Sequence, residues 1–456
     1  MAMGSRERRR KQQGLWVAAA DLPKSASHPF YSRLNQFLDE QKFDEFCEGQ
    51  CARFYAEKMG RPGLAPGIYF RTLMLGYFEG IDSERGIAWR AADSLSLRSF
   101  LRLTIDEDSP DHSTISRTRR LIDLETHRAI FAWILERLAE GDLLKGRTVG
   151  VDGTTLEANA AMRSIVRRDT GEGYEQFLIN LAKASGIETP TREDLARVDK
   201  KRKNKASNQD WHNPNDADAR ITKMKDGSTH LAHKVEHAVD MGSGAVLAVV
   251  LHPADEGDTD TIMTTLACAG ERLAEVQASP AGERLSPNGI EEAVADKGYL
   301  SDEALRQAAD AGVRTYLPEK HNVHRDFRGK PAEKKRFLAN RRRIRGARGK
   351  ALLRSRGELI ERSFAHAYGT GGMRRTHLKR HPNILKRLHV HVGAQNLALL
   401  MLRCFGMGKP RTLQGKTAPQ TEAGRQKPLF IRFLALIWTL LALSPPVSTL
   451  SVAAVL

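Results

Sequence analysis

The sequence is poor in cysteine, and this scarcity excludes two common ways of stabilising a fold. Cys47, Cys51, Cys268 and Cys404 are the only four among 456 residues. They are too few and too scattered for a disulfide scaffold or a four-ligand zinc site. A reducing, cytoplasmic environment is therefore expected.

Apolar runs long enough to cross a membrane are also missing. The basic residues Arg6–Lys11 precede a segment, 14–20, that is too short and mixed for a secretory signal. Residues 429–443 are apolar apart from Arg432 and Thr439, but fifteen residues rise only about 22 Å as a helix, less than a bilayer. We expect a docking helix or frayed tail there and no membrane partner.

The sequence also has fewer acidic than basic residues, and it has no nucleotide-binding fingerprint. Neither a Walker lysine pattern nor G-x-G-x-x-G occurs at a strand-to-helix turn, so no nucleotide cofactor is expected. The 72 Lys and Arg outnumber the 55 Asp and Glu, which leaves a formal charge of +17. Nucleic acid is the first candidate partner, because neutralising its phosphates releases counterions.

What is present begins with a helical region. Across residues 30–140 apolar side chains recur at spacings of three and four, and Ser83 and Ser113 stand where helix N-caps belong. The short helix expected at 113–121 carries three arginines that either contact DNA or decorate a solvated face: Arg117, Arg119 and Arg120.

After residue 145 the pattern changes to alternating strands and helices, which predicts an α/β domain. The expected elements are a strand at 148–152, a hairpin of 234–240 and 245–251, a helix at 259–273, a strand at 292–295, a helix capped by Ser301 and a strand at 313–317. No internal repeat is found.

Two segments depart from this alternation. Residues 160–230 are polar, with basic residues at 200–205, and predict an irregular insertion or long loop. Residues 325–356 hold fourteen basic and only two acidic residues, which would repel one another unless a polyanion lay against them. We expect much of this second segment to be a flexible arm along DNA.

Two aspartates follow short apolar strands. Asp152 ends Val149-Gly-Val151, and Asp296 ends Glu292-Ala-Val-Ala295. Strand ends of open α/β sheets host active sites, so the pair could share metal ions. A lone aspartate of this kind is more often a turn residue, as we expect for four others: Asp240, Asp255, Asp258 and Asp260.

A glutamate in a basic region is the third candidate. Residues 334–421 contain twenty-two Lys and Arg but only two acids, Glu358 and Glu361. Both fall on one expected helix and share roughly one face, so spacing does not choose between them. Three carboxylates brought together repel one another unless divalent cations bind, and Mg²⁺ prefers such oxygen ligands together with phosphates. Phosphoryl transfer is the chemistry that such a site suits.

The chain resembles the DDE transposases of bacterial insertion sequences over roughly residues 28–405. The motifs that carry the resemblance are Gly60-Arg-Pro62, Leu97-Arg-Ser-Phe100 and Ser109-Pro-Asp-His-Ser-Thr114 with Arg117 in the helical part, and Val151-Asp-Gly-Thr154, Ala295-Asp-Lys-Gly-Tyr299 and Glu361-Arg-Ser-Phe364 in the core.

This resemblance implies an RNase H-like mixed sheet flanked by helices, preceded by an all-α domain. It selects Glu361 over Glu358 and implies that Asp152, Asp296 and Glu361 bind two Mg²⁺ or Mn²⁺ ions. Two family positions differ here, because Gly357 replaces an arginine and Tyr368 a lysine. Basic residues that could substitute are Arg354, Arg356, Arg374, Arg375 and Lys379, of which the last three are expected to contact DNA.

Four regions are therefore expected. They are a basic N-terminal arm (1–27), a helical DNA-binding domain (28–145), an RNase H-like catalytic domain (146–405) with an insertion at about 160–230, and an unassigned, partly hydrophobic tail (406–456).

The expected function is metal-dependent cleavage and strand transfer at the terminal inverted repeats of an insertion sequence. The protein would act on target DNA as a homo-oligomer, in the cytoplasm with the nucleoid. The rival readings are an RNase H-like DNA nuclease and a non-catalytic DNA-binding protein derived from a transposase.

Overall fold

The computed structural model describes residues 28–56, 63–202, 207–224, 227–319 and 325–413. The expected N-terminal arm and the apolar stretch 429–443 lie outside these residues. Within them, none of the helices combines the length and apolar character needed to cross a bilayer.

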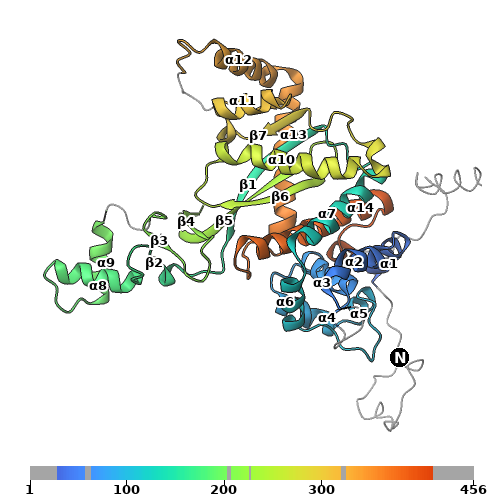
Figure 1. Cartoon of the computed structure of the whole chain (residues 1–456), viewed down its shortest axis with the longest axis horizontal. Helices are drawn as coiled ribbons and strands as arrows, with labels where there is room; N and C mark the ends of the chain where they lie inside the picture. Colours follow the sequence, from blue (N-terminus) through green and yellow to red (C-terminus); the bar gives the residue numbers. More distant parts are fainter. Residues whose placement is uncertain (1–27, 57–62, 203–206, 225–226, 320–324, 414–456) are drawn as a thin grey trace, which may run out of the picture.

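The N-terminal region is helical, as predicted (Figure 1). Its elements are α1 (Pro29–Glu40), α2 (Phe43–Cys51), η3 (Ala52–Phe54), α3 (Pro66–Glu79), α4 (Glu84–Ala92), α5 (Leu95–Phe100), α6 (His112–Leu121) and α7 (Leu124–Glu140).

One of the two predicted caps in this region is correct. Ser83 caps α4, and its hydroxyl accepts a hydrogen bond from the amide of Gly86 at 3.1 Å. The prediction for Ser113 is wrong, because α6 begins earlier and Asp111 is its cap. The Asp111 carboxylate accepts from the amides of Ser113 and Thr114 at 2.6 and 2.9 Å, and a charged acceptor is the stronger cap at a helix N-terminus.

The core contains a mixed sheet. Its strands are β1 (Thr148–Glu157), β4 (Arg220–Lys223), β5 (Thr229–Asp240), β6 (Val246–Pro253), β7 (Glu292–Ala295) and β8 (Arg314–Tyr316). They are ordered β4-β5-β1-β7-β8, with β6 also paired to β5. β5 is antiparallel to β1 and β6, whereas β7 runs parallel to β1 and β8 parallel to β7.

Helices cover both faces of this sheet. The helical elements of this part of the chain are α10 (Asp258–Gln277), η5 (Pro280–Arg284), η6 (Lys297–Tyr299), α11 (Asp302–Asp310), α12 (Pro331–Arg345), α13 (Ala347–Phe364), the π-turn η7 (Ala365–Thr370), α14 (His381–Phe405) and η8 (Pro410–Leu413). In β5, Glu236 contacts α10 while the next residue, His237, contacts α13. Successive strand residues point to opposite faces, so α10 and α13 lie on opposite sides. The predicted fold class, an α/β core with a helical N-terminal region, is confirmed.

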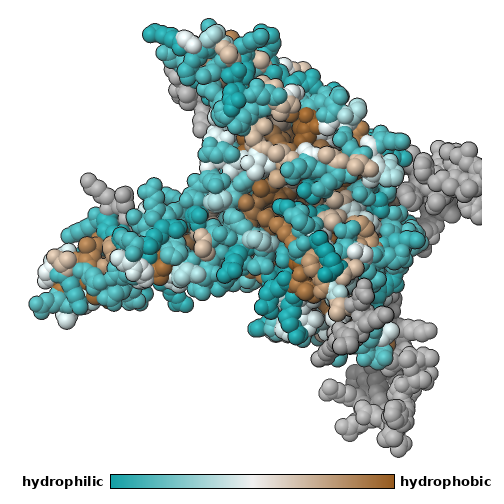
Figure 2. Space-filling model, viewed as in Figure 1, coloured by the Kyte–Doolittle hydropathy of each residue, from teal (hydrophilic) through white to brown (hydrophobic). Residues whose placement is uncertain are grey.

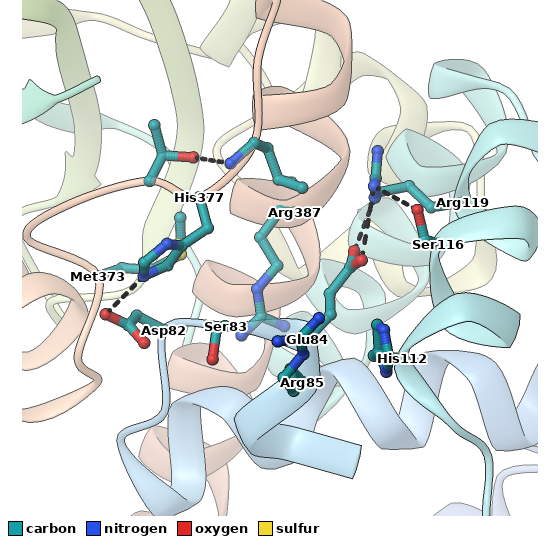
Figure 3. A pocket seen from close by; sticks show the side chains of 12 residues that line it. Asp82, Ser83, Glu84, Arg85, His112, Ser116, Arg119, Met373, His377 and Arg387 are labelled. Atoms are coloured by element: carbon teal, nitrogen blue, oxygen red, sulfur yellow. Dashed lines mark hydrogen bonds and ion pairs between the residues drawn. The ribbon is translucent and has the colours of Figure 1, made fainter. Parts of the chain in front are cut away.

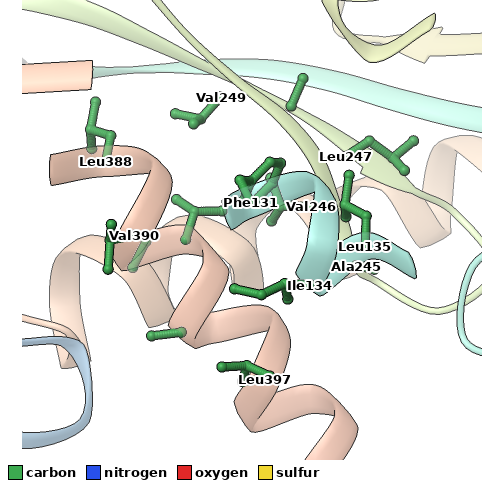
Figure 4. Close-up of a cluster of buried hydrophobic side chains, with 14 of the residues drawn as sticks. Phe131, Ile134, Leu135, Ala245, Val246, Leu247, Val249, Leu388, Val390 and Leu397 are labelled. Carbon is green, nitrogen blue, oxygen red and sulfur yellow. The ribbon is translucent and has the colours of Figure 1, made fainter. Parts of the chain in front are cut away.

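The hydrophobic core joins the N-terminal helices to the sheet. Phe131, Ile134 and Leu135 of α7 pack with apolar residues of β6 and α14 (Figure 4). The Asn396 side chain of α14 accepts from the amide of Val246 at 3.0 Å and donates to its carbonyl at 2.8 Å, which satisfies the edge of β6. In Figure 2 hydrophilic side chains cover most of the visible face, and apolar ones gather mainly over the central elements. The helical region is therefore anchored directly on the sheet and its helices.

The segment 160–230, predicted to be an irregular insertion or long loop, contains a folded lobe, so the prediction that it is irregular is wrong. It contains η4 (Met162–Ser164), β2 (Val166–Arg167), α8 (Tyr174–Ala184), α9 (Arg192–Lys201) and β3 (Trp211–His212), and Figure 1 shows it projecting away from the sheet. Trp211 is buried in a small separate core with Ile165 and Ile221. Because Tyr174 and Phe177 pack edge-on against the Trp211 ring, a few aromatic contacts hold an otherwise polar segment.

The predicted flexible arm at 325–356 is likewise mostly helical. α12 is fixed to β8 by Asn340, whose side chain donates to the carbonyl of Leu317 at 2.8 Å and accepts from its amide at 3.1 Å. Arg343 donates to the carbonyl of Thr315 at 2.9 Å. The charged composition suggested a flexible segment, but these polar side chains bind the edge strand and so fix the helix. Gly346 only separates α12 from α13.

Candidate active site

Asp152 lies on β1, on the face that α13 covers. The strand continues to Glu157, so Asp152 does not end β1 as the sequence predicted; it lies where the parallel pairing with β7 ends. One carboxylate oxygen accepts from the amide of Gly153 at 2.8 Å and the other from Arg356 of α13 at 2.8 Å. Burial raises the pKa of Asp152, and the hydrogen bonds from Gly153 and Arg356 only partly oppose this rise.

Asp296 lies directly beside it. Val151 pairs with Ala295 at the last position of the parallel ladder, so the two residues that follow, Asp152 and Asp296, lie next to each other where this ladder ends. Asp296 caps η6 and accepts from the amide of Lys297 at 2.6 Å. The charge of Asp296 contributes to the raised pKa of Asp152, as expected for two carboxylates at close range. The structure therefore brings the two predicted aspartates together.

Glu361 lies on α13, which crosses over β1. Ile360 is buried against Gly150, where an added Cβ would lie 2.7 Å from its Cδ1 atom. A Cβ added to Gly244, in the turn beside the start of β1, would lie 3.4 Å from Cδ2 of Leu359. Because helix residues are about 100° apart, Glu361 lies on the opposite side of α13 from Leu359, the side on which β1 continues from Gly150 to Asp152.

The glutamate is nevertheless exposed and does not meet the aspartates. Across the described ranges, no three His, Cys, Asp or Glu side chains lie close enough together to hold a metal ion. Glu358 is exposed too and pairs with Arg362 at 2.5 Å on the outer side of α13. The structure thus assembles two of the three predicted carboxylates and leaves the third on the neighbouring helix.

A buried polar network holds the turn that follows Asp296. The Tyr299 hydroxyl donates to Glu236 at 3.0 Å, and Glu236 also accepts from Thr261 and Thr265 of α10 at 2.5 and 2.6 Å. Lys234 lies 3.0 Å from Glu236. Burial tends to raise the pKa of Glu236, but these hydrogen bonds and the Lys234 charge outweigh it and lower the pKa. Sequence reasoning missed this network, although a glutamate inside an apolar strand was a signal for it.

Tyr368, at the position where the family resemblance leads one to expect a lysine, is a packing residue. It is buried in η7, and its hydroxyl lies 2.8 Å from Nε2 of His237, whose Nδ1 lies 3.1 Å from Ser363. Phe364 stacks on the same imidazole ring. Burial lowers the pKa of His237 to about 3, so the ring is neutral and serves to dock α13 on β5.

Comparison with known families identifies both halves of the chain. Residues 19–121 match the transposase domain DUF772, and residues 208–397 match the transposase DDE domain. This chain belongs to the DDE transposases. The predicted family and the DNA transposase function are thereby confirmed, and no curated protein matches the sequence.

The match to the DDE domain covers only part of the candidate site of this transposase. Asp296 and Glu361 fall inside the DDE match, whereas Asp152 precedes it. The first match ends with α6, which is the helix that carries the predicted DNA-contacting arginines.

Those three arginines have different surroundings. Arg117 and Arg120 are exposed. Arg119 is only 6% exposed, and its guanidinium donates to Glu84 at 2.7 Å and to Asn383 of α14 at 3.1 Å. In this structure Arg119 therefore ties α6 to α4 and α14, a role that the sequence pattern did not reveal, and it is not available to a phosphate.

The other predicted DNA contacts of the transposase lie before α14. Arg374 and Arg375 are exposed and Lys379 is half-buried. Their segment runs along the far end of β1, because the amide of Glu157 donates to the carbonyl of Arg374 at 3.2 Å and the amide of Thr376 to that of Glu157 at 2.9 Å. These basic side chains thus follow the strand that carries Asp152.

Proposed function

We propose that this transposase cuts and joins DNA by phosphoryl transfer with Asp152, Asp296 and Glu361 as its metal-binding carboxylates. The observation that supports this most strongly is the pairing of Val151 with Ala295, which sets the two aspartates side by side. Adjacent carboxylates repel, and the arrangement is stabilised when cations lie between them.

The donor set fits Mg²⁺ or Mn²⁺. Asp152 and Asp296 offer only oxygen ligands, which these ions prefer, and Glu361 on the near side of α13 would complete the set. Two such ions would activate the attacking oxygen and stabilise the leaving oxygen of an in-line displacement.

Arg356 is the residue whose binding partner would change when metal ions bind the carboxylates. Its guanidinium now supplies the positive charge beside Asp152. When that carboxylate has another cationic partner, the long side chain is free to bind a DNA phosphate near the reacting strand. Arg356 would then perform the task that the family assigns to an arginine at position 357.

The organisation of the chain follows from the same proposal. We assign residues 28–145 to binding of the element ends and 146–405 to catalysis, with the lobe at about 160–230 inserted in the latter. Cutting at two ends and joining them to target DNA calls for two active sites, so the protein would act as a homo-oligomer on DNA.

Removal of divalent metal should abolish cleavage. The assay would use labelled DNA carrying the two ends of the element, with EDTA, Mg²⁺ or Mn²⁺. We expect nicking and joined products only with metal, because the carboxylates cannot neutralise the reacting phosphate themselves. Cleavage without joining would favour a nuclease, and no cleavage with either metal would favour a non-catalytic DNA-binding protein.

Neutralising Arg117 and Arg120 together should flatten the salt dependence of DNA binding. Loss of two phosphate contacts is expected to reduce the slope of log K against log salt by about 1.8. The matched control is Arg306→Gln on α11, an arginine that is already paired with Glu303 and Asp310. Equal slopes for the wild type and the Arg117→Gln/Arg120→Gln variant would exclude this face of α6.

A further inference from the structure

A polar cavity of about 430 Å³ lies between the N-terminal helices and the segment before α14. Its size is in the range of sites that hold small ligands. Figure 3 shows side chains from α4, α6 and the 373–387 region converging on it. The lining residues that the argument uses are Asp82, Glu84, Arg85, Arg119, His377 and Arg387.

Both acidic groups of the cavity already have partners. Glu84 accepts from Arg119 at 2.7 Å, and Asp82 lies 3.1 Å from Nε2 of His377 (Figure 3). Arg85 is exposed at the cavity and makes no ion pair with any described residue. The cavity therefore carries more positive than negative charge.

Arg387 is the second cation of the cavity that makes no ion pair with a described residue, although the charges of Glu84 and Asp82 favour its protonated form. It is 2% exposed, and its terminal nitrogens donate to the backbone carbonyls of Leu73 at 2.6 Å and Ile81 at 3.3 Å. No described residue accepts a hydrogen bond from its Nε. Burial lowers the pKa of Arg387 to about 10, which still leaves the side chain charged at neutral pH. A buried guanidinium without a carboxylate is costly, and an anion beside it would offset that cost.

Two neighbouring features favour an anion on a nucleic acid. The N-terminus of α4 opens on the cavity at Ser83 and Glu84, and helix N-termini attract phosphates. Exposed cations continue outward on both sides, with Arg117 and Arg120 on α6 and Arg374 and Arg375 before α14. A chain of phosphates could follow these cations from α6 to β1.

We propose that this cavity receives a backbone phosphate of DNA, with its sugar, and so clamps DNA between the N-terminal helices and the catalytic core. Arg85 contacts the phosphate from the solvent-exposed side of the cavity, and Arg387 contributes positive charge from its buried side. The inference rests on the DNA transposase function but not on the three carboxylates. It explains why a buried arginine of α14 reaches into the helical region.

The test compares Arg85→Gln with a matched control on the same helix, Arg90→Gln, which removes an arginine already paired with Glu79. Binding of the full chain to a mixed-sequence DNA duplex is measured across a salt series. Arg85→Gln should reduce the slope of log K against log salt by about 0.9, while Arg90→Gln leaves it unchanged. At one DNA phosphate, ethylation should weaken DNA binding by the wild type more than DNA binding by Arg85→Gln.

An unchanged slope for Arg85→Gln, with normal wild-type binding, overturns the proposal. The proposal is also overturned if inorganic phosphate stabilises the wild type but not Arg85→Gln, while the slope of log K against log salt for DNA binding is the same in both. The site would then bind free phosphate. Absence of DNA binding by the wild type would instead contradict the proposed function itself, so the two failures are distinguishable.

Discussion

Replacing Asp152 or Asp296 by Asn should reduce cleavage and joining by at least about 100-fold. Changes to groups that merely support a metal ligand cost about 10–100-fold, and loss of a ligand should cost more. The amide keeps the size of the side chain but removes the charge that the cations need. DNA affinity should hold or rise, because each change removes a negative charge from the DNA-facing edge.

The control for this prediction is a carboxylate of the same region without a role at the sheet edge. Asp260→Asn on α10 should leave cleavage near normal. Asp240 is unsuitable, because it is 2% exposed and accepts hydrogen bonds from the amides of Gly146 at 2.7 Å and Gly242 at 2.8 Å. Thermal melting of each variant separates lost chemistry from lost folding, and normal cleavage by Asp152→Asn would remove it from the site.

Glu236→Gln should produce the largest loss of stability. The fully buried carboxylate accepts from Tyr299 and two threonines and faces Lys234, so removing its charge leaves Asp258, at 2.7 Å, as the one acidic group paired with that lysine among the described residues. Breaking a buried ion pair costs about 3–5 kcal/mol of stability. Because Lys234 keeps Asp258 as a partner, we expect a loss at the lower end of this range, about 3 kcal/mol. A fall in Tm of roughly 6–12 °C is expected. Cleavage should fall as well, because Tyr299 no longer holds the turn after Asp296.

The pH dependence gives this prediction a second readout. The pKa of Glu236 is lowered in the folded protein, so its contribution to stability is complete above the unfolded value of about 4.3 and is lost as the pH falls through the folded value. The Tm difference between wild type and Glu236→Gln should therefore be full at pH 7 and narrow below about pH 4. Glu303→Gln, which breaks an exposed pair with Arg306, should change Tm little at either pH.

Parts of the core could be predicted from the sequence because strands such as β6 and β7 are short and apolar. Residues 292–295 form a strand with the predicted bounds, and Ser301 caps the next helix through the amide of Ala304 at 3.0 Å. The hairpin around Gly244 also forms as predicted, with a φ of +83° that suits glycine. Local propensity and tertiary packing agree at these positions.

The insertion lobe and α12 could not be predicted, because contacts distant in sequence decide their structure. Tyr174 and Trp211 are far apart along the chain, and composition gives no hint that their rings meet. Asn340 looks like a surface residue, but it is fully buried against β8. Charge-rich composition alone therefore predicted too little structure.

At the candidate site the sequence identified the two adjacent aspartates but not the groups around them. The strand end before Asp296 followed from the hydrophobic pattern, whereas the pairing of Arg356 with Asp152 depends on the angle at which α13 crosses β1. The burial of Arg119 depends on Glu84, which lies in a different helix. Spacing along one helix cannot show which arginine a neighbouring helix neutralises.

The most direct test of the account compares Glu361→Gln with Glu358→Gln in cleavage of labelled element ends with Mg²⁺ or Mn²⁺. The two residues share α13 and are both exposed, but only Glu358 is paired with Arg362. The account predicts that Glu361→Gln binds DNA but cuts at least about 100-fold more slowly, while Glu358→Gln cuts normally. Near-normal cleavage by Glu361→Gln with loss of cleavage by Glu358→Gln would contradict it.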